Sequence, residues 1–138
     1  MTNKRTWLGM LAMVLVLGMT VVACEEEDQV YPAELKVTNS STANITLVEF
    51  RTLSGTVVRS DRAGISTNNS KTYTFDSDFT GSAKVEFVAV GGLATGEATI
   101  SNLDLYTGYD KGGSHQAPTK KELLASGSMA SGFEITIK

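Results

Sequence analysis

Short segments in which apolar and polar residues alternate make up most of the chain after Pro32. Alternation with a period of two residues is typical of strands with one buried face, and no stretch sustains the longer period of a helix. The clearest segment is Ser82–Val90, which places Ala83, Val85 and Phe87 on one face. The same pattern recurs in Ala33–Thr38, Ile45–Thr52, Thr56–Ser60, Lys71–Phe75, Glu97–Leu105 and Gly132–Lys138. The pattern predicts an all-β domain of about seven strands.

Clusters of Gly, Ser, Asn and Asp separate these segments and predict turns. Leu53-Ser54-Gly55, between two of the segments, is typical of a hairpin. In Ile45–Thr52 the apolar residues change parity between Leu47 and Val48, which predicts a β-bulge or a strand covered on both faces. Short strands joined by such turns favour an antiparallel β-sandwich, immunoglobulin-like in its number of strands only, with a small β-barrel as the alternative.

One segment, Tyr106–Ser131, departs from the alternation and is rich in Gly and Ser. We expect most of it to be a loop, and long loops in compact domains are often functional or mobile. Within it, Thr119 and Glu122 have the spacing of a helix capping box ahead of Leu123-Leu124-Ala125, and Gly127 follows as a stop signal. The sequence therefore predicts one short helical turn near residues 119–125, inserted before the last strand.

The first 23 residues differ in character from the rest of the chain. Lys4 and Arg5 supply positive charge, and no charged residue occurs from Trp7 to Val22. This apolar run of about 16 residues is shorter than the ~20 residues that a membrane-spanning helix needs. A basic start, a short apolar centre and a small residue at the end are typical of a secretory signal peptide.

The end of this segment, Val21-Val22-Ala23-Cys24, resembles the lipobox of bacterial lipoproteins, in which a hydrophobic residue and small residues precede a cysteine. Leucine is commoner than valine at the first position. The resemblance covers residues 1–24 and implies cleavage between Ala23 and Cys24, a diacylglycerol thioether on the cysteine, and acylation of its new α-amine by a chain such as palmitate. Two acyl chains suffice for stable attachment, since each buried CH₂ contributes ~0.8 kcal/mol. The alternative is an ordinary signal peptide, or an uncleaved anchor, with an incidental cysteine.

An acidic run, Glu25-Glu26-Glu27-Asp28, follows the cysteine. It should stay solvated, because anionic headgroups attract Lys and Arg instead. Together with Gln29 to Pro32 it forms a predicted acidic tether over residues 24–32, between the signal peptide of residues 1–23 and a sandwich domain of residues 33–138. The run also resembles the acidic export signal that follows the lipidated cysteine in some outer-membrane bacteria, which implies display at the cell surface. A merely solvated linker is the alternative.

The charge of the mature chain excludes one class of partner. Lys4 and Arg5 leave with the signal, so 10 basic and 15 acidic residues remain, a formal charge of about −5. Phosphate binding needs a basic face, so we expect no nucleic acid partner. Cys24 is the single cysteine of the chain, which rules out an internal disulfide.

Few residues suggest catalysis or a cofactor. The single histidine, His115, follows Gly112-Gly113 in a Gly-rich stretch, and the sequence contains no Gly-x-Ser-x-Gly motif. With one histidine and a cysteine committed to lipid, a zinc site has too few ligands. We therefore expect no enzyme activity, no metal and no cofactor.

Calcium has one weak candidate site. Asp76 and Asp78 place two carboxylates at alternate positions, and Asp104 and Asp110 could approach them in space. Calcium takes six to eight oxygen ligands, however, and no calcium-binding loop motif follows. Turn formation explains these aspartates more simply.

The best candidate for a ligand-binding surface is the Gly-rich loop from Asp104 to His115. Tyrosine combines a rigid apolar ring with a hydroxyl, which suits contacts with a glycan or a protein ligand. The candidate residues are Tyr106, Tyr109, Asp110, Lys111 and His115. The alternative is that one tyrosine closes the end of the sandwich while the other residues are solvated.

These features together favour a lipoprotein that is anchored in a bacterial envelope, at the outer membrane or the cell surface, through acylated Cys24. We expect it to present a small non-catalytic β-sandwich for binding or structural roles. Two alternatives remain open: a subunit of a larger surface complex, and a small envelope hydrolase that uses carboxylates such as Asp76, Asp78 and Asp104.

Overall fold

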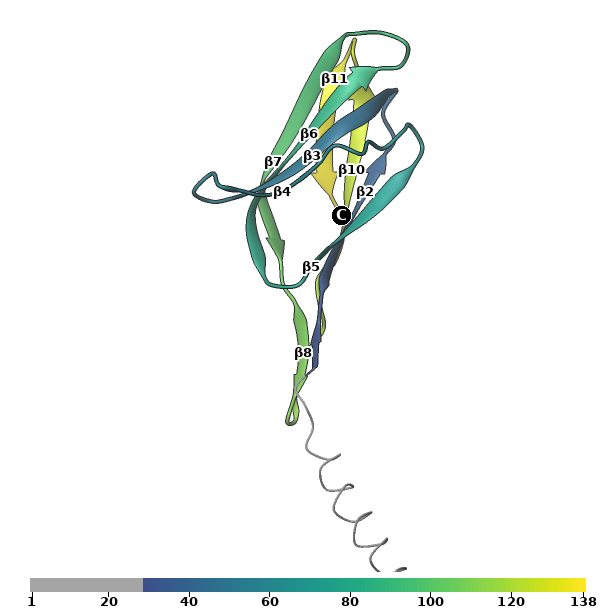
Figure 1. The fold of residues 1–138 in the computed structure, drawn as a ribbon. Coiled ribbons are helices and arrows are strands. Elements are labelled where there is room, and N and C mark those ends of the chain that lie inside the picture. Colours follow the sequence, from purple (N-terminus) through teal and green to yellow (C-terminus); the bar gives the residue numbers. More distant parts are fainter. Residues whose placement is uncertain (1–28) are drawn as a thin grey trace, which may run out of the picture.

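The computed structural model describes residues 29–138, which form eleven β-strands (Figure 1). Two four-stranded sheets have the orders β11-β10-β2-β5 and β4-β3-β6-β7, and a third sheet has the order β1-β8-β9. The strands are β1 (Gln29–Tyr31), β2 (Ala33–Asn39), β3 (Ala43–Thr52), β4 (Val57–Asp61), β5 (Ser70–Phe75), β6 (Phe79–Ala89), β7 (Thr95–Leu105), β8 (Gly108–Lys111), β9 (Ser114–Gln116), β10 (Lys120–Ser128) and β11 (Gly132–Ile137). The signal peptide, Cys24 and the acidic run lie outside the described residues.

The two four-stranded sheets pack face to face, so the predicted all-β sandwich is confirmed. Their inward residues alternate along each strand and form one core, because successive side chains of a strand point to opposite faces. Ala83, Val85 and Phe87 of β6 are fully buried on that face. The strands stay in separate sheets and do not close on themselves, so the alternative of a small barrel is wrong.

The predicted bulge and hairpin are both present. β3 pairs with β6, and the register shifts between Ile45 and Leu47, close to where the apolar residues change parity. Ile45, Val48 and Phe50 therefore all reach the core although they do not share one parity. The turn after Thr52 leads from β3 into β4, its antiparallel neighbour.

The predicted loop and helical turn within 106–131 are wrong, because this segment contains β8, β9 and β10. β10 is an internal strand of its sheet, parallel to β2 on one side and antiparallel to β11 on the other. Leu123 and Ala125 are fully buried while Leu124 between them is half-buried, so the burial has the period of a strand. Two ladders of backbone hydrogen bonds outweigh the short helix that the local sequence favours.

The two residues that suggested the helix cap have other partners. Glu122 Oε2 accepts a 2.6 Å hydrogen bond from Thr38 Oγ1 on the neighbouring strand. Thr119 Oγ1 accepts a hydrogen bond of 2.9 Å from the backbone N–H of Tyr106, and the Thr119 N–H donates to the Tyr106 carbonyl. Thr119 and Glu122 thus contact other segments of the chain and do not cap a helix.

The two sheets contact each other along one side of the sandwich, the closed side, and a groove separates their edges along the other, the open side. On the closed side β7 contacts β11, and the ring of Phe87 stacks on Phe133 with centroids 4.1 Å apart. On the other side the edge strands β4 and β5 are joined by polar side chains and border a groove. Residues 29–138 include no helix that is long and apolar enough to cross a membrane.

Candidate functional site

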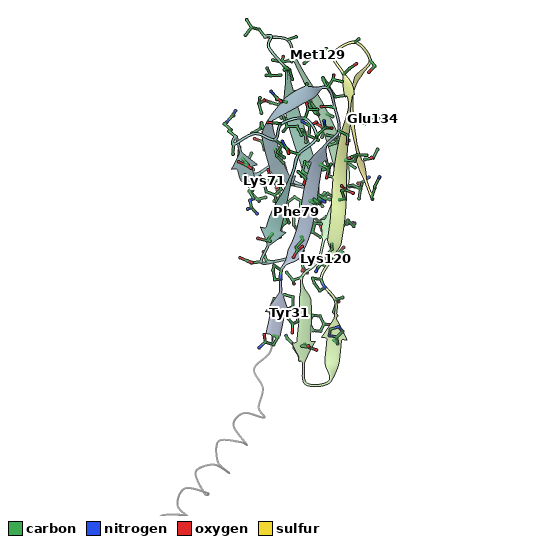
Figure 2. All side chains as sticks on the ribbon, turned by 90° about the vertical axis from the view of Figure 1, so that its right-hand side faces the viewer. Tyr31, Lys71, Phe79, Lys120, Met129 and Glu134 are labelled. Atoms are coloured by element: carbon green, nitrogen blue, oxygen red, sulfur yellow. The ribbon has the colours of Figure 1, made fainter. Side chains whose placement is uncertain are left out.

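The small sheet of β1, β8 and β9, which we call the stalk, contains most of the residues expected to bind a ligand. β1 pairs antiparallel with β8, with Gln29 opposite Asp110 and Tyr31 opposite Gly108. Figure 1 shows β8 projecting from one end of the sandwich, and Figure 2 shows Tyr31 on this projection with Met129 at the opposite end. Residues 29–31, expected to belong to the tether, thus form a strand, and Pro32 alone separates it from β2.

Side chains at the base of the stalk hold it to the sandwich. Asp78 Oδ1 accepts hydrogen bonds from both the N–H and the hydroxyl of Thr107, at 2.8 and 3.0 Å. Gln116 Nε2 donates to the Thr107 carbonyl at 2.9 Å. Gly108 lies so close to Pro118 that a Cβ there would stand 2.5 Å from the proline ring. The stalk is therefore a continuation of the domain with several attachments, and Asp78 provides one of them by contacting a residue 29 positions away in the chain.

Four of the five candidate ligand-binding residues lie together on the stalk. The carboxylate of Asp110 contacts His115 Nδ1 through Oδ1 at 3.0 Å and accepts a 3.4 Å hydrogen bond from the Tyr31 hydroxyl through Oδ2. Lys111 Nζ lies 5.8 Å from the centre of the Tyr109 ring. The sequence pattern did not indicate Tyr31, although the apolar pair Val30-Tyr31 is unusual in a segment expected to be a solvated tether.

The fifth candidate, Tyr106, lies at the base of the stalk and is 45% exposed. Two hollows flank the stalk, with volumes of about 480 and 380 Å³. The larger is lined by Asp78, Tyr106, Thr107, Tyr109, Gln116, Ala117 and Thr119, and the smaller by Tyr31, Pro32, Glu34, His115, Ala117, Pro118 and Lys120. The larger combines tyrosine rings with hydroxyl and amide groups, and the smaller combines tyrosine and proline rings with charged side chains and a histidine. Aromatic rings beside polar groups are the surface chemistry expected of a glycan or peptide contact.

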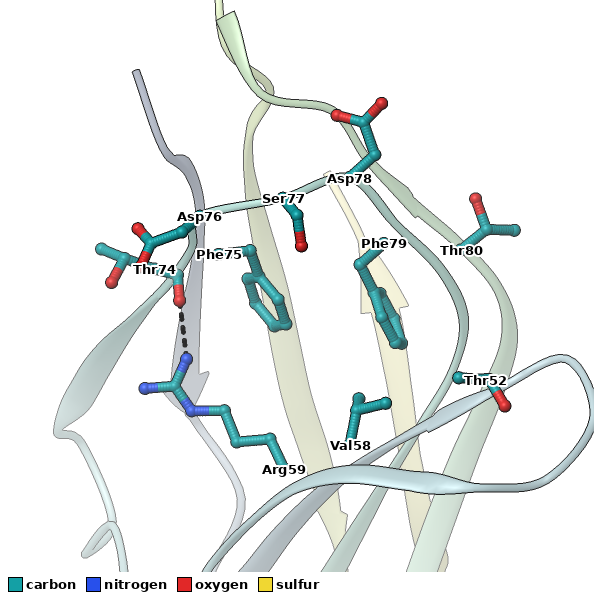
Figure 3. Close-up of a pocket in the computed structure, with 10 residues that line it drawn as sticks. All are labelled: Thr52, Val58, Arg59, Thr74, Phe75, Asp76, Ser77, Asp78, Phe79 and Thr80. Atoms are coloured by element: carbon teal, nitrogen blue, oxygen red, sulfur yellow. Dashed lines mark hydrogen bonds between the residues drawn. The ribbon is translucent and has the colours of Figure 1, made fainter. Parts of the chain in front are cut away.

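The groove between β4 and β5 is a second candidate, with a volume of about 430 Å³ (Figure 3). Figure 3 shows the rings of Phe75 and Phe79 side by side beneath the turn that joins their strands, with Val58 across from them. Val58 is 49% exposed. The Arg59 guanidinium crosses to β5, where Nη1 donates a 2.6 Å hydrogen bond to the Thr74 carbonyl. The groove thus offers an apolar floor and a strand edge to a ligand.

Asp76 and Asp78 both line this groove and stand at its outer rim. Asp104 contributes only its carbonyl to the contact with Lys121 Nζ, at 3.1 Å. Over residues 29–138 the structure brings no three His, Asp or Glu side chains close enough together to hold a metal ion. The aspartates singled out for calcium or hydrolysis therefore do not form one cluster in this part of the chain.

Asp61, which no sequence motif indicates, is the carboxylate among residues 29–138 whose pKa departs most from its ordinary value. Its Oδ2 accepts hydrogen bonds from Lys71 Nζ at 2.6 Å and from the Tyr73 hydroxyl at 2.7 Å, and its Oδ1 accepts one from the Ala63 N–H at 2.9 Å. These contacts, with Lys71 first, lower the pKa of Asp61 from 3.8 to about 2. Burial, and next the bond to Asp61, raises the pKa of Tyr73 above its usual 10.0.

The contacts of Asp61, Lys71 and Tyr73 indicate a role in stability and not in catalysis. A carboxylate that already accepts three hydrogen bonds and has a lowered pKa is a weak proton acceptor at neutral pH. Its partners instead join the edge of one sheet to the edge of the other. No single residue near Asp61 signals this role, because Tyr73 reaches it only once the two sheets have packed.

Comparisons with known proteins assign no family. No family model matches the chain, and no curated protein is significantly similar to it. An NMR structure of a protein from Eubacterium rectale is similar over 77% of this chain and 87% of that chain, with 8% sequence identity and a TM-score of 0.48.

Proposed function

We propose that the protein is a lipoprotein of a bacterial envelope, anchored through acylated Cys24, that presents a non-catalytic β-sandwich at the outer membrane or cell surface. The observation that carries the proposal is Val21-Val22-Ala23-Cys24, which ends a basic and then apolar segment and precedes an acidic run. A single cysteine at that boundary fits modification by lipid, since the chain offers it no disulfide partner.

The position of the stalk supports the proposal. Strand β1 begins at Gln29, five residues after Cys24, and it lies on a projection at one end of the domain. An anchor at Cys24 would therefore hold the domain by that end and leave the opposite end, with the β6–β7 and β10–β11 turns, pointing away from the membrane. This arrangement suits a lipoprotein that presents these loops to partners.

The groove between β4 and β5 supports a binding role more than a catalytic one. Its floor consists of aromatic rings, Phe75 and Phe79, and its cation, Arg59, is held by the Thr74 carbonyl and lies 5.6 Å from the Phe75 ring. An apolar floor beside the edge strand β4 suits an extended peptide, which could add its backbone to the sheet edge.

Metabolic labelling with palmitate tests the anchor. The wild-type protein should carry the label and remain with the membrane fraction, whereas the Cys24→Ala variant should lose the label and keep its uncleaved signal segment. A Lys36→Ala variant is the matched control, because Lys36 is exposed on β2 and its replacement leaves both the lipobox and the stalk intact. Label that persists in Cys24→Ala would refute lipidation at this cysteine.

Protease treatment of intact cells tests surface display. If the acidic run is an export signal, neutral replacement of its four residues (Glu25→Gln, Glu26→Gln, Glu27→Gln and Asp28→Asn) should leave acylation unchanged and protect the domain from added protease. Equal digestion of the wild type and this variant would show that the run is only a spacer.

A further inference from the structure

We propose that the tip of the stalk contacts the phospholipid headgroups of the membrane that carries the anchor. The contact surface consists of the turn Lys111–Ser114, with Val30 and Tyr109 immediately behind it. This inference rests on the proposed lipid anchor, because the anchor sets the distance between the stalk and the membrane. It adds a second point of attachment, which fixes the orientation of the domain where a single tether would let it swing.

The length of chain between Cys24 and the stalk limits how far the tip can stand from the membrane. Four residues lie between Cys24 and Gln29, and the five steps from one Cα to the next span at most ~18 Å when the chain is fully extended. The tip of the stalk extends beyond Gln29, away from the sandwich, at the end of β1 where the tether joins it. Gln29 pairs with Asp110, so the turn after Lys111 lies beyond the end of β1, on the side away from the sandwich.

About two residues of β8 and its turn extend past the level of Gln29, which at ~3.4 Å per residue shortens the gap by ~7 Å. The tip then lies within ~11 Å of the anchored cysteine even when the tether is fully extended. The headgroup layer of one leaflet is ~5–8 Å thick. A bend that shortens the tether by ~3–6 Å brings the tip into that layer, so the geometry favours contact.

The side chains at the tip suit this environment. Val30 is 57% exposed, and Tyr31 beside it is 37% exposed, an unusual pair of apolar groups for a surface strand. Tyr109 carries the ring over which the Lys111 ammonium lies at 5.8 Å. Tyrosine is enriched at membrane interfaces because one end of its ring is apolar and the other is polar. Lysine adds electrostatic attraction to anionic headgroups.

The carboxylate of the tip, Asp110, already has two contact partners within the stalk. Asp110 contacts His115 through one carboxylate oxygen and Tyr31 through the other. Lys111, by contrast, has no carboxylate within ion-pair distance among residues 29–138. The lysine is thus available to a lipid phosphate. Its ammonium group binds phosphate as a point charge and donates hydrogen bonds to the phosphate oxygens.

A tryptophan substitution can report the contact, since the only tryptophan, Trp7, is removed with the signal peptide. We would reconstitute the full-length lipidated Tyr109→Trp protein into vesicles of phosphatidylglycerol and brominated phosphatidylcholine. Its emission should move to shorter wavelength and lose most of its intensity relative to vesicles without bromine. The matched control is Leu93→Trp, which replaces a residue that is 93% exposed in the β6–β7 turn at the other end of the domain. Its emission should not change.

Adding Lys111→Gln to Tyr109→Trp, or raising the salt concentration, should weaken the quenching. Quenching that both treatments leave unchanged would overturn the role of Lys111.

Vesicle flotation and the mass of the acylated N-terminal peptide, measured on the same samples, separate the proposed anchor from the proposed stalk contact. An acylated protein that floats with the vesicles while Tyr109→Trp behaves like Leu93→Trp overturns the stalk contact alone. A protein without acyl chains that fails to float overturns the proposed anchor.

Discussion

The hydroxyl of Tyr73 donates a 2.7 Å hydrogen bond to the carboxylate of Asp61, and this bond joins the edge strand of one sheet to the edge strand of the other. Lys71 adds a 2.6 Å ion pair to the same carboxylate oxygen. The Arg59 guanidinium lies 5.2 Å from the centre of the Tyr73 ring and so packs against the same side chain. The open side of the sandwich is therefore held by polar contacts, whereas the closed side is held by the stacked rings of Phe87 and Phe133.

The first prediction concerns the strength of this bond. Tyr73→Phe should lower the free energy of unfolding by about 1–2 kcal/mol, because a hydrogen bond to a charged group is lost while the buried ring remains. Asp61→Asn should cost at least as much, since it also removes the ion pair with Lys71. Urea unfolding of both single variants and the double variant gives the coupling energy, which we expect to lie near 1 kcal/mol.

An ion pair on the outer face of strand β6 supplies the control for this double-mutant comparison. Lys84 Nζ lies 3.2 Å from Glu86 Oε2, with both side chains about a third exposed. Lys84→Gln should change the free energy of unfolding by less than about 0.5 kcal/mol. A coupling energy between Asp61 and Tyr73 no larger than this value would mean that their bond does not hold the open side.

The second prediction concerns acid stability. The folded-state pKa of Asp61, about 2, lies below the ordinary 3.8, so its contribution is present above pH 3.8 and is lost as the pH falls toward 2. The difference in unfolding free energy between the wild type and Asp61→Asn should therefore shrink over this range. Urea unfolding at neutral pH and at several lower values measures it. A difference that stays constant down to pH 2 would contradict the lowered pKa.

The second prediction has a counterpart in alkali, where the same bond predicts a loss of stability. The pKa of Tyr73 is raised in the folded state, so folding favours the neutral phenol, and this contribution is full below pH 10 and is lost as the pH rises above it. The wild type should lose stability above pH 10 faster than Tyr73→Phe, which has no phenol to ionise. The comparison cancels the titration of the lysines, which both proteins share. Parallel curves for the two proteins would refute the prediction.

The strands that the sequence predicted correctly are those whose evidence is local. Ala83, Val85 and Phe87 alternate within one segment, so their common face follows from the geometry of a strand wherever its neighbours lie. The bulge in β3 was also visible locally, because the change of parity must be absorbed by the strand itself.

The features that the sequence did not predict are contacts between segments that are distant in the chain. Thr119 and Glu122 fit a helix cap equally well until Tyr106 and Thr38 are placed beside them. The stalk was missed for the same reason: β1 has three residues before a proline, and only its pairing with β8 makes it a strand. The candidate residues of the loop were found by composition, but their grouping around Asp110 was not.

The third prediction tests β10 as an internal strand. Leu123→Ala should lower the free energy of unfolding by about 2–4 kcal/mol, because its side chain is fully buried in the core. Leu124→Ala should cost clearly less, since this residue is half-buried on the opposite face. Thermal or urea unfolding compares the two variants. Equal costs would contradict the alternation of burial along this strand.

The fourth prediction concerns Gly81, where β6 passes close to β3. A Cβ at this position would stand 1.9 Å from the Arg51 carbonyl oxygen, a backbone atom that cannot rotate away. Gly81→Ala should therefore cost more than about 2 kcal/mol or prevent folding, since it must push two paired strands apart. Gly92→Ala is the control, because its nearest neighbour, the Ala89 Cβ, would be 3.5 Å away. We expect that variant to stay within about 0.5 kcal/mol of the wild type. Circular dichroism and urea unfolding measure both, and a folded Gly81→Ala as stable as Gly92→Ala would show that the strands do not approach as closely as described.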